Sequence, residues 1–173
     1  RFVSPTDRES NMLLIREALI SRVSIPSENV YFIATEGITP EESAKEYEGK
    51  LQRFFHNETL PRFDLIMLGI GDDGHSASLF PGSPCLHETK RLVVSTVANT
   101  SPRERISLTL PVINHARSVV FLTTGERKAP VMREILEEKN SSLPAAQVRP
   151  DKGSLLFVLD NCAASLLSQR TSD

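Results

Sequence analysis

The segment at residues 64–84, D-L-I-M-L-G-I-G-D-D-G-H-S-A-S-L-F-P-G-S-P, constrains the fold of this chain more than any other. The apolar run at residues 63–68 predicts a strand that is buried on both faces. The glycines that follow allow a tight loop, because glycine adopts backbone conformations that other residues avoid. We therefore expect His75 to lie beyond the end of this strand, at the sheet edge where open parallel sheets bind ligands.

A histidine held at such an edge beside two carboxylates is a natural general base. We predict that His75 and Asp73 are catalytic. Asp73 is expected to fold the turn through an Asx-type bond to a nearby backbone N–H and to polarise the surroundings of His75. Asp72 is expected to face solvent. An ordinary surface histidine that caps a turn is the alternative reading of the same loop.

Three better-known motifs share letters with this loop, and each fails on a physical ground. The G-x-G-x-x-G run at residues 69–74 must open a long helix to bind a dinucleotide, yet Pro81 and Pro84 allow only a short one. Its two aspartates would also repel phosphate. No serine lies in G-x-S-x-G. The Asp-Asp-Gly run lacks the alternating oxygen ligands and the distal glutamate of a calcium loop.

The run G-I-G-D-D-G-H-S-A-S-L-F-P-G-S-P resembles the signature of the 6-phosphogluconolactonases, within the glucosamine-6-phosphate isomerase/6-phosphogluconolactonase family. Further blocks of the chain resemble the family in the same order. They are R-F-V at residues 1–3 with E-S-N at 9–11, R-I-S-L-T-L-P at 105–111, G-E-R-K-A at 125–129 and L-P-A-A at 143–146.

The resemblance implies a carboxylic ester hydrolase that converts 6-phospho-D-glucono-1,5-lactone to 6-phospho-D-gluconate in the oxidative pentose phosphate pathway. It implies that His75 takes a proton from the attacking water, with neither a cofactor nor a metal. Backbone N–H groups of the glycine loop are candidates for stabilising the oxyanion. The substrate-binding residues that we predict are Arg1, Gly74, Arg105 and Lys128, with Arg1 and Lys128 holding the phosphate.

Each of these cations also has an ordinary interpretation. Lys128 lies near a predicted helix start, where a lysine is unfavourable for the helix dipole and so hints at an anionic ligand. Without the resemblance, a solvated lysine explains the position better. Arg105 is equally compatible with a surface ion pair, and Arg1 with a disordered terminus.

The family's usual opening strand and G-G-S-T-P loop do not precede Arg1. We therefore expect the chain to be N-terminally truncated or part of a longer polypeptide. Two alternatives stay open. One is a glucosamine-6-phosphate deaminase-like enzyme, whose loop is similar but typically continues I-A-F-N-E-P instead of the S-A-S-L-F-P found at residues 76–81. The other is a non-catalytic fragment that lacks the phosphate loop.

Composition limits the partners of the chain. Its 173 residues carry a net charge of -2, which provides no basic field for nucleic acid. No apolar run approaches the length of a membrane span. Cys85 and Cys162 are too few to suggest a disulfide framework, so we expect a cytoplasmic protein. They do not suggest a zinc site either, and Cys85 with His87 is a weak metal pair. The expected partner is a small sugar-phosphate lactone, and a fused or associated glucose-6-phosphate dehydrogenase is a further partner that the resemblance suggests.

Helical and strand patterns alternate along the chain, without a repeat or an interdomain linker. They predict one α/β domain over residues 1–173 with a largely parallel sheet. The resemblance implies that this domain is three-layered and Rossmann-like, of the type that the deaminases share, with helices on both faces of the sheet. Capping boxes are expected at Thr6 with Glu9 and at Thr39 with Glu42. The expected strands are at residues 30–34, 63–68, 92–98, 106–110, 118–123 and 155–160, and the expected helices follow the two capping boxes and occupy 126–139 and 161–169.

Overall fold

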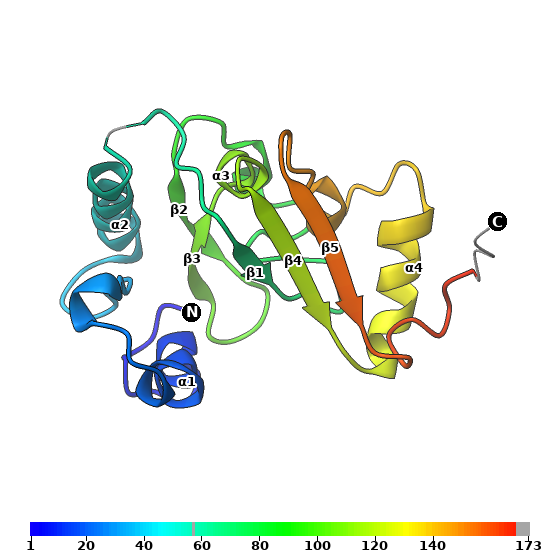
Figure 1. Cartoon of the computed structure of the whole chain (residues 1–173), viewed down its shortest axis with the longest axis horizontal. Helices are drawn as coiled ribbons and strands as arrows, with labels where there is room; N and C mark the ends of the chain where they lie inside the picture. Colours follow the sequence, from blue (N-terminus) through cyan, green and yellow to red (C-terminus); the bar gives the residue numbers. More distant parts are fainter. Residues whose placement is uncertain (57, 169–173) are drawn as a thin grey trace. The chain divides into compact units, whose positions relative to one another are not determined.

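The computed structural model describes residues 1–56 and 58–168, which form two compact units (Figure 1). The first unit contains the described residues of Arg1–Thr59 and Arg91–Leu108, and the second those of Leu60–Lys90 and Thr109–Asp173. The first unit has helices α1 (Asn11–Ala18) and α2 (Pro40–Phe54), the short 3-10 turns η1 (Ile20–Arg22) and η2 (Ser27–Asn29), and strands β2 (Val93–Val97) and β3 (Glu104–Leu108). The second has strands β1 (Ile66–Leu68), β4 (Ser118–Thr123) and β5 (Ser154–Leu159), helices α3 (Leu110–Asn114) and α4 (Ala129–Glu137), and the 3-10 turns η3 (Pro84–His87), η4 (Glu126–Lys128) and η5 (Pro144–Gln147).

The three strands of the second unit confirm the predicted parallel α/β class. They are ordered β1-β4-β5 and all run parallel. Val119 and Phe121 on the central strand are fully buried, and the Phe121 ring stacks on Phe157 at 4.9 Å between ring centroids. The loop that contains His75 therefore begins at the end of β1, a strand of a sheet that its apolar core holds in place. That the whole chain is one domain stays a prediction.

Strands β2 and β3 form a separate antiparallel pair, with Val93 opposite Leu108 and Val97 opposite Glu104. The second strand ends two residues earlier than expected. Leu110 already begins α3, since Pro111 fits the first turn of a helix and cannot donate to a strand ladder.

Helix α2 begins as the sequence predicts. The Thr39 side chain accepts from the Glu42 N–H, the Glu42 carboxylate accepts from the Thr39 N–H at 2.9 Å, and Pro40 occupies the first turn. The capping box expected at Thr6 and Glu9 is wrong. Residues 4–10 form turns in which the Asp7 carboxylate accepts from the Glu9 N–H, and Ser10 caps α1 instead.

The strand expected at residues 30–34 does not form. A strand needs a partner for its backbone groups, and here helix α2 satisfies the carbonyls with side chains. The three donors are the Tyr47 hydroxyl to the Tyr31 carbonyl, the Lys50 ammonium to Phe32, and the Ser43 hydroxyl to Ala34.

The expected helix at residues 126–139 is present in shortened form, as η4 followed by α4. The helix expected at residues 161–169 does not form over residues 161–168, and Gln169 lies outside the described residues. Residues 161–166 form turns, although the Asp160 carboxylate accepts from the Ala163 N–H at 2.7 Å as a helix N-cap would. The same carboxylate accepts from the Gly125 N–H. Within the described residues, no helix has the length and apolar character needed to cross a membrane.

Candidate active site

The loop after β1 folds back on itself and is closed by backbone hydrogen bonds. The Gly71 N–H donates to the His75 carbonyl at 2.9 Å, and the Gly74 N–H donates to the Gly71 carbonyl at 3.0 Å. The Ser76 hydroxyl donates to the Gly69 carbonyl at 3.1 Å, which fastens the far side of the loop to its start. The loop is therefore tight, as the glycine spacing predicts, and it presents His75 just beyond the strand.

His75 and Asp73 are in direct contact. Nδ1 of His75 lies 2.6 Å from Oδ1 of Asp73, and the His75 backbone N–H donates to the same oxygen at 3.1 Å, which is the predicted Asx-type bond. Partial burial raises the pKa of Asp73, but these hydrogen bonds outweigh it and hold the pKa below its ordinary value. A carboxylate that accepts from Nδ1–H leaves the lone pair of a neutral imidazole on Nε2, which is the nitrogen that can accept a proton.

The position of the His75 ring depends on Gly71. A Cβ atom added to Gly71 would lie 2.0 Å from Nδ1 of His75 and 2.5 Å from Oδ1 of Asp73, well inside van der Waals contact. The ring also contacts Phe80, with 4.7 Å between ring centroids. The His75 side chain keeps 33% of its surface exposed, so it is fixed between neighbours and still open to a ligand.

Gly74 supports this arrangement from behind the loop. Its φ angle of +78° is one that residues with a side chain rarely adopt, and an added Cβ would lie 2.7 Å from the Leu143 side chain. Its carbonyl accepts from the Ala145 N–H at 3.1 Å. The L-P-A-A segment at residues 143–146 thus buttresses the histidine loop, a role that its sequence alone did not reveal.

Lys128 lies beside the same loop. Its ammonium group forms an ion pair with Asp72, and Nε of Arg127 lies 4.0 Å from the other Asp72 oxygen. The hydrogen bond from Lys128 holds the pKa of Asp72 below its ordinary value. Asp72 is half exposed, as expected, but it also has this ion-pair role, which the sequence did not suggest.

Arg1 and Arg105 belong to the first unit, where they are near one another. Arg1 pairs with Glu9, and the Phe2 N–H donates to the Glu104 carbonyl. Among the residues that the structure describes, the Arg105 side chain forms no ion pair of the kind that its alternative interpretation requires. Only 7% of the residue is exposed, and its Nη1 atom has no hydrogen-bond partner among the described residues. Burial, with a further contribution from the Arg1 charge, lowers the pKa of Arg105.

The predicted site residues thus fall into two groups. His75, Asp73, Gly74 and Lys128 come together in the second unit, and Arg1 and Arg105 in the first. The backbone N–H groups of Gly71 and Gly74 both donate within the loop. That N–H groups of the glycine loop stabilise an oxyanion stays a prediction.

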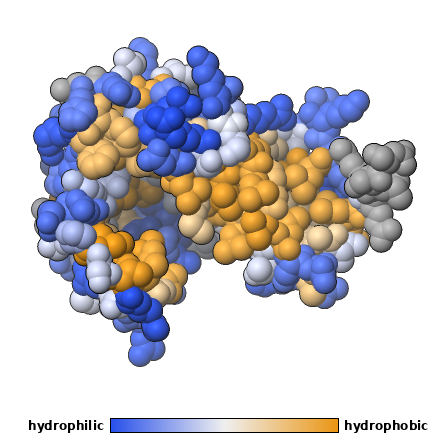
Figure 2. All heavy atoms as spheres, viewed as in Figure 1, coloured by the Kyte–Doolittle hydropathy of each residue, from blue (hydrophilic) through white to orange (hydrophobic). Residues whose placement is uncertain are grey.

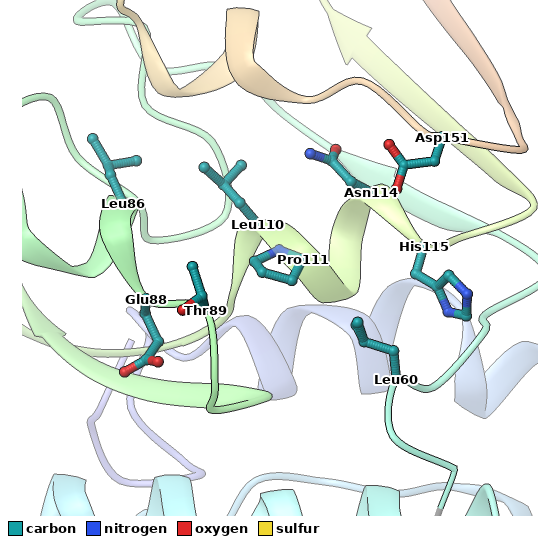
Figure 3. Close-up of a pocket in the computed structure, with 9 residues that line it drawn as sticks. All are labelled: Leu60, Leu86, Glu88, Thr89, Leu110, Pro111, Asn114, His115 and Asp151. Atoms are coloured by element: carbon teal, nitrogen blue, oxygen red, sulfur yellow. The ribbon is translucent and has the colours of Figure 1, made fainter.

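The second unit also has a cavity of about 290 Å³ that does not include the histidine loop (Figure 3). Leu60, Leu110 and Pro111 line it together with Asn114, His115 and Asp151. His115 has a backbone partner at this cavity, because its Nδ1 lies 3.3 Å from the Pro61 carbonyl oxygen. In the parts of the chain that the structure describes, no three His, Cys, Asp or Glu side chains are grouped so that they could hold a metal ion.

Comparison with known proteins identifies relatives over almost the whole chain. The family model described as glucosamine-6-phosphate isomerases/6-phosphogluconolactonase matches residues 1–157. The chain is 44% identical to a 6-phosphogluconolactonase of Rattus norvegicus over 169 residues, which are 97% of this chain and 65% of the rat protein. It therefore spans slightly less than two thirds of the length of that relative.

Solved structures agree with this match. The structure of 6-phosphogluconolactonase from Trypanosoma brucei superposes with a TM-score of 0.83 at 30% identity, over 97% of this chain and 72% of that one. A monomeric glucosamine-6-phosphate deaminase superposes with a TM-score of 0.75 at 20% identity, over 95% of this chain and 70% of that one. The likeness to the deaminase is one of fold alone.

Proposed function

The chain belongs to the glucosamine-6-phosphate isomerase/6-phosphogluconolactonase family, and we propose that it acts in the hydrolysis of 6-phospho-D-glucono-1,5-lactone to 6-phospho-D-gluconate, a step of the pentose phosphate pathway. The observation that carries this proposal is the contact between His75 and Asp73 just beyond the parallel strand β1, which is buried at Ile66 and exposed at Met67. The relatives named 6-phosphogluconolactonase support the lactone as substrate. The S-A-S-L-F-P continuation at residues 76–81 favours this reaction over deamination.

His75 is the proposed general base. Asp73 holds Nδ1–H, so Nε2 is free to take a proton from a water molecule as its oxygen attacks the lactone carbonyl carbon. The new C–O bond converts the carbonyl to a tetrahedral oxyanion. Asp73 stabilises the imidazolium that forms in the same step, because its carboxylate is held ionised by the hydrogen bonds from His75.

The tetrahedral intermediate then collapses to the carboxylic acid by breaking the bond between the carbonyl carbon and the ring oxygen. His75 returns its proton to that oxygen, which becomes the free hydroxyl group of the product. One water is consumed, and His75 ends the cycle as it began. The chemistry needs only a base that is fixed and partly exposed, which matches the surroundings of the His75 ring.

The phosphate requires cations, and two sets are candidates. Lys128 and Arg127 stand beside the histidine loop, where Asp72 holds the lysine ammonium in place. Arg105 with Arg1 is the second set, and the buried, unpartnered Nη1 of Arg105 is a donor that a phosphate oxygen could satisfy. We assign the phosphate to Lys128 first, because its ammonium group forms the closer ion pair with Asp72 of the histidine loop and its side chain is less exposed than that of Arg127.

The test is hydrolysis of the phosphorylated lactone, measured against its spontaneous rate. His75→Ala should lower the catalysed rate by about 10²–10⁴-fold, the usual range for loss of a general base. The matched control is His87→Ala, since His87 is an exposed histidine in η3 of the same unit. If the chain alone gives no rate above background, the comparison is repeated with the remaining residues of the rat relative fused to it. Equal rates for His75→Ala and His87→Ala in an active protein would disprove the assignment of His75 as the general base. Release of ammonia from glucosamine 6-phosphate would favour the deaminase-like alternative.

A cytoplasmic location and a fused or associated glucose-6-phosphate dehydrogenase belong to the same proposal. Cys85 and Cys162 form no disulfide, which is compatible with a reducing compartment.

A further inference from the structure

The strands β4 and β5 run side by side and end at the same edge of the sheet, where α4 follows from β4 (Figure 1). Thr123 and Leu159 form their last pair, and the Asp160 N–H donates to the Thr123 carbonyl at 3.4 Å just beyond it. Figure 2 shows that the hydrophobic surface of these strands gives way to hydrophilic residues at this edge. Because β1 runs parallel to β4, its loop with His75 leaves the sheet at the same edge.

The Asp160 side chain binds the turn that follows β4. The Gly125 N–H lies 3.1 Å from Oδ1 and 3.0 Å from Oδ2 of the Asp160 carboxylate. Gly125 has a φ angle of +96°, which residues with a side chain rarely adopt. The path of this turn therefore depends on the glycine and on the carboxylate that holds its N–H, although the two residues are 35 positions apart in the sequence.

The same turn carries Lys128. The Lys128 N–H donates to the Gly125 carbonyl at 3.0 Å, so the lysine backbone is held one turn after the residue that Asp160 binds. The Lys128 side chain is only 21% exposed, and its ammonium group pairs with Asp72 of the histidine loop. Asp160, Gly125, Lys128 and Asp72 thus form one continuous series of contacts from the end of β5 to the histidine loop.

We propose that Asp160 is a positioning residue for the Lys128 ammonium group and that, through Gly125, it sets how tightly the site holds the phosphate of its substrate. The part about the substrate rests on the proposed function, whereas the part about the lysine rests on these contacts alone. Lysine has a flexible four-carbon stem, so its ammonium is placed well only when its backbone and its ion-pair partner are both fixed. Asp160 fixes the first, and Asp72 is the second.

An ordinary structural role is the competing interpretation. The Asp160 carboxylate also accepts from the Ala163 N–H at 2.7 Å, which stabilises the turns after β5. Loss of that bond alone would lower stability and would affect the two lactones equally. A positioning role instead predicts an effect on the phosphorylated substrate that disappears once Lys128 is removed.

The first measurement is steady-state hydrolysis by the protein that is active in the test of His75. Asp160→Ala should raise KM for the phosphorylated lactone by at least about fivefold with little change in kcat, and should leave hydrolysis of unphosphorylated gluconolactone nearly unchanged. Asp160→Asn keeps one oxygen for the Gly125 N–H and should restore most of the loss. The matched control is Asp151→Ala, at an exposed aspartate that precedes the other end of β5.

A double-mutant cycle tests whether Asp160 acts through Lys128. In a Lys128→Ala background, Asp160→Ala should have almost no further effect on KM for the phosphorylated lactone, since no ammonium group is left to position. The proposal is wrong if Asp160→Ala retains its full effect in that background. It is also wrong if the KM values for both lactones rise equally in Asp160→Ala.

The second measurement needs no substrate. The pKa of the Asp72 carboxyl lies below its ordinary value because Lys128 donates to it, and NMR can follow its titration. Asp160→Ala should raise this pKa toward its value in Lys128→Ala, Asp151→Ala should leave it unchanged, and Asp160→Asn should give an intermediate value that remains measurable if the alanine variant does not fold. A wild-type pKa of Asp72 in folded Asp160→Ala, or in Asp160→Asn where only that variant folds, would overturn the proposal. If His75→Ala failed to lower hydrolysis, the proposed function would be wrong, and the titration of Asp72 would still decide whether Asp160 positions Lys128.

Discussion

Gly71 and His75 are packed so closely that the glycine has no room for a side chain, with an added Cβ only 2.0 Å from Nδ1 of the histidine. The hydrogen bond from the Gly71 N–H to the His75 carbonyl fixes the same two residues through the backbone. Gly71 is therefore a positioning residue for the proposed base. Glycine is required here by the lack of space for a side chain, since the φ angle of Gly71 is not in the left-handed region.

Gly71→Ala should lower kcat for lactone hydrolysis by at least about tenfold, because a methyl group at this position displaces the ring from Asp73. Gly69→Ala is the matched control, since a Cβ on Gly69 would have no heavy atom within 4 Å. Steady-state rates and far-UV circular dichroism should be measured on both variants. A folded Gly71→Ala protein with the kcat of Gly69→Ala would show that the His75 ring does not need this space.

Asp73→Asn tests the orientation of the base. The amide keeps the size of the carboxylate but loses the charge that stabilises the imidazolium, so we expect kcat to fall by about 10–100-fold with little change in KM. The pair should also couple. In a His75→Ala background, Asp73→Asn should have almost no further effect, and a full additional loss would mean that Asp73 acts separately from His75.

The loop was predictable because its determinants are local. Glycine spacing, an apolar strand and a carboxylate two residues before His75 are all readable in sequence, and the Asx-type bond of Asp73 is confirmed at 3.1 Å. The second capping box is likewise confirmed, since its two partners are three residues apart. Contacts within a few residues depend little on the rest of the fold.

The errors and omissions involve distant partners. The ion pair of Asp72 with Lys128 joins a loop to a 3-10 turn far along the chain, and no local pattern announces it. Residues 30–34 have a strand's composition, yet β-structure depends on a partner, and helix α2 takes their carbonyls instead. Strands β2 and β3 likewise pair with each other, which their separate patterns could not specify.

Acid stability should depend on Asp72. Its pKa in the folded chain lies below the ordinary value, so the folded state holds this proton less readily than the unfolded state. The stabilisation by Lys128 is thus complete above an ordinary carboxyl pKa of about 3.9 and is lost as the pH falls further, through the folded-state value. Because the Asp72 side chain is 51% exposed, we expect only a few tenths of a kcal/mol.

Between about pH 6 and about pH 3, the wild-type Tm should therefore fall by about 1 °C more than that of Asp72→Asn. Calorimetry of both proteins is the measurement, with Glu138→Gln as the control, since Glu138 is an exposed carboxylate that makes no ion pair among the described residues. A steeper fall in Asp72→Asn than in wild type would contradict the sign of the shift.

The phosphate assignment makes the sharpest prediction, and it requires a catalytically active protein. Lys128→Ala should weaken binding of the phosphorylated lactone by about 1.5–3 kcal/mol, the range for a hydrogen bond to a charged group. Part of that loss could come from Asp72, which is left facing the phosphate once its lysine is removed. Comparing Lys128→Ala in the wild-type and Asp72→Asn backgrounds separates the two contributions, because only the loss of the cation persists in the second.

The second substrate tests the same assignment. Unphosphorylated gluconolactone should be hydrolysed at nearly the same rate by all of these variants, since it has no phosphate for Lys128 to bind. Lys139→Ala, at an exposed lysine beyond α4, should affect neither substrate. An equal loss on both substrates in Lys128→Ala would mean that the lysine supports the histidine loop through Asp72, and the phosphate would then fall to Arg105 and Arg1.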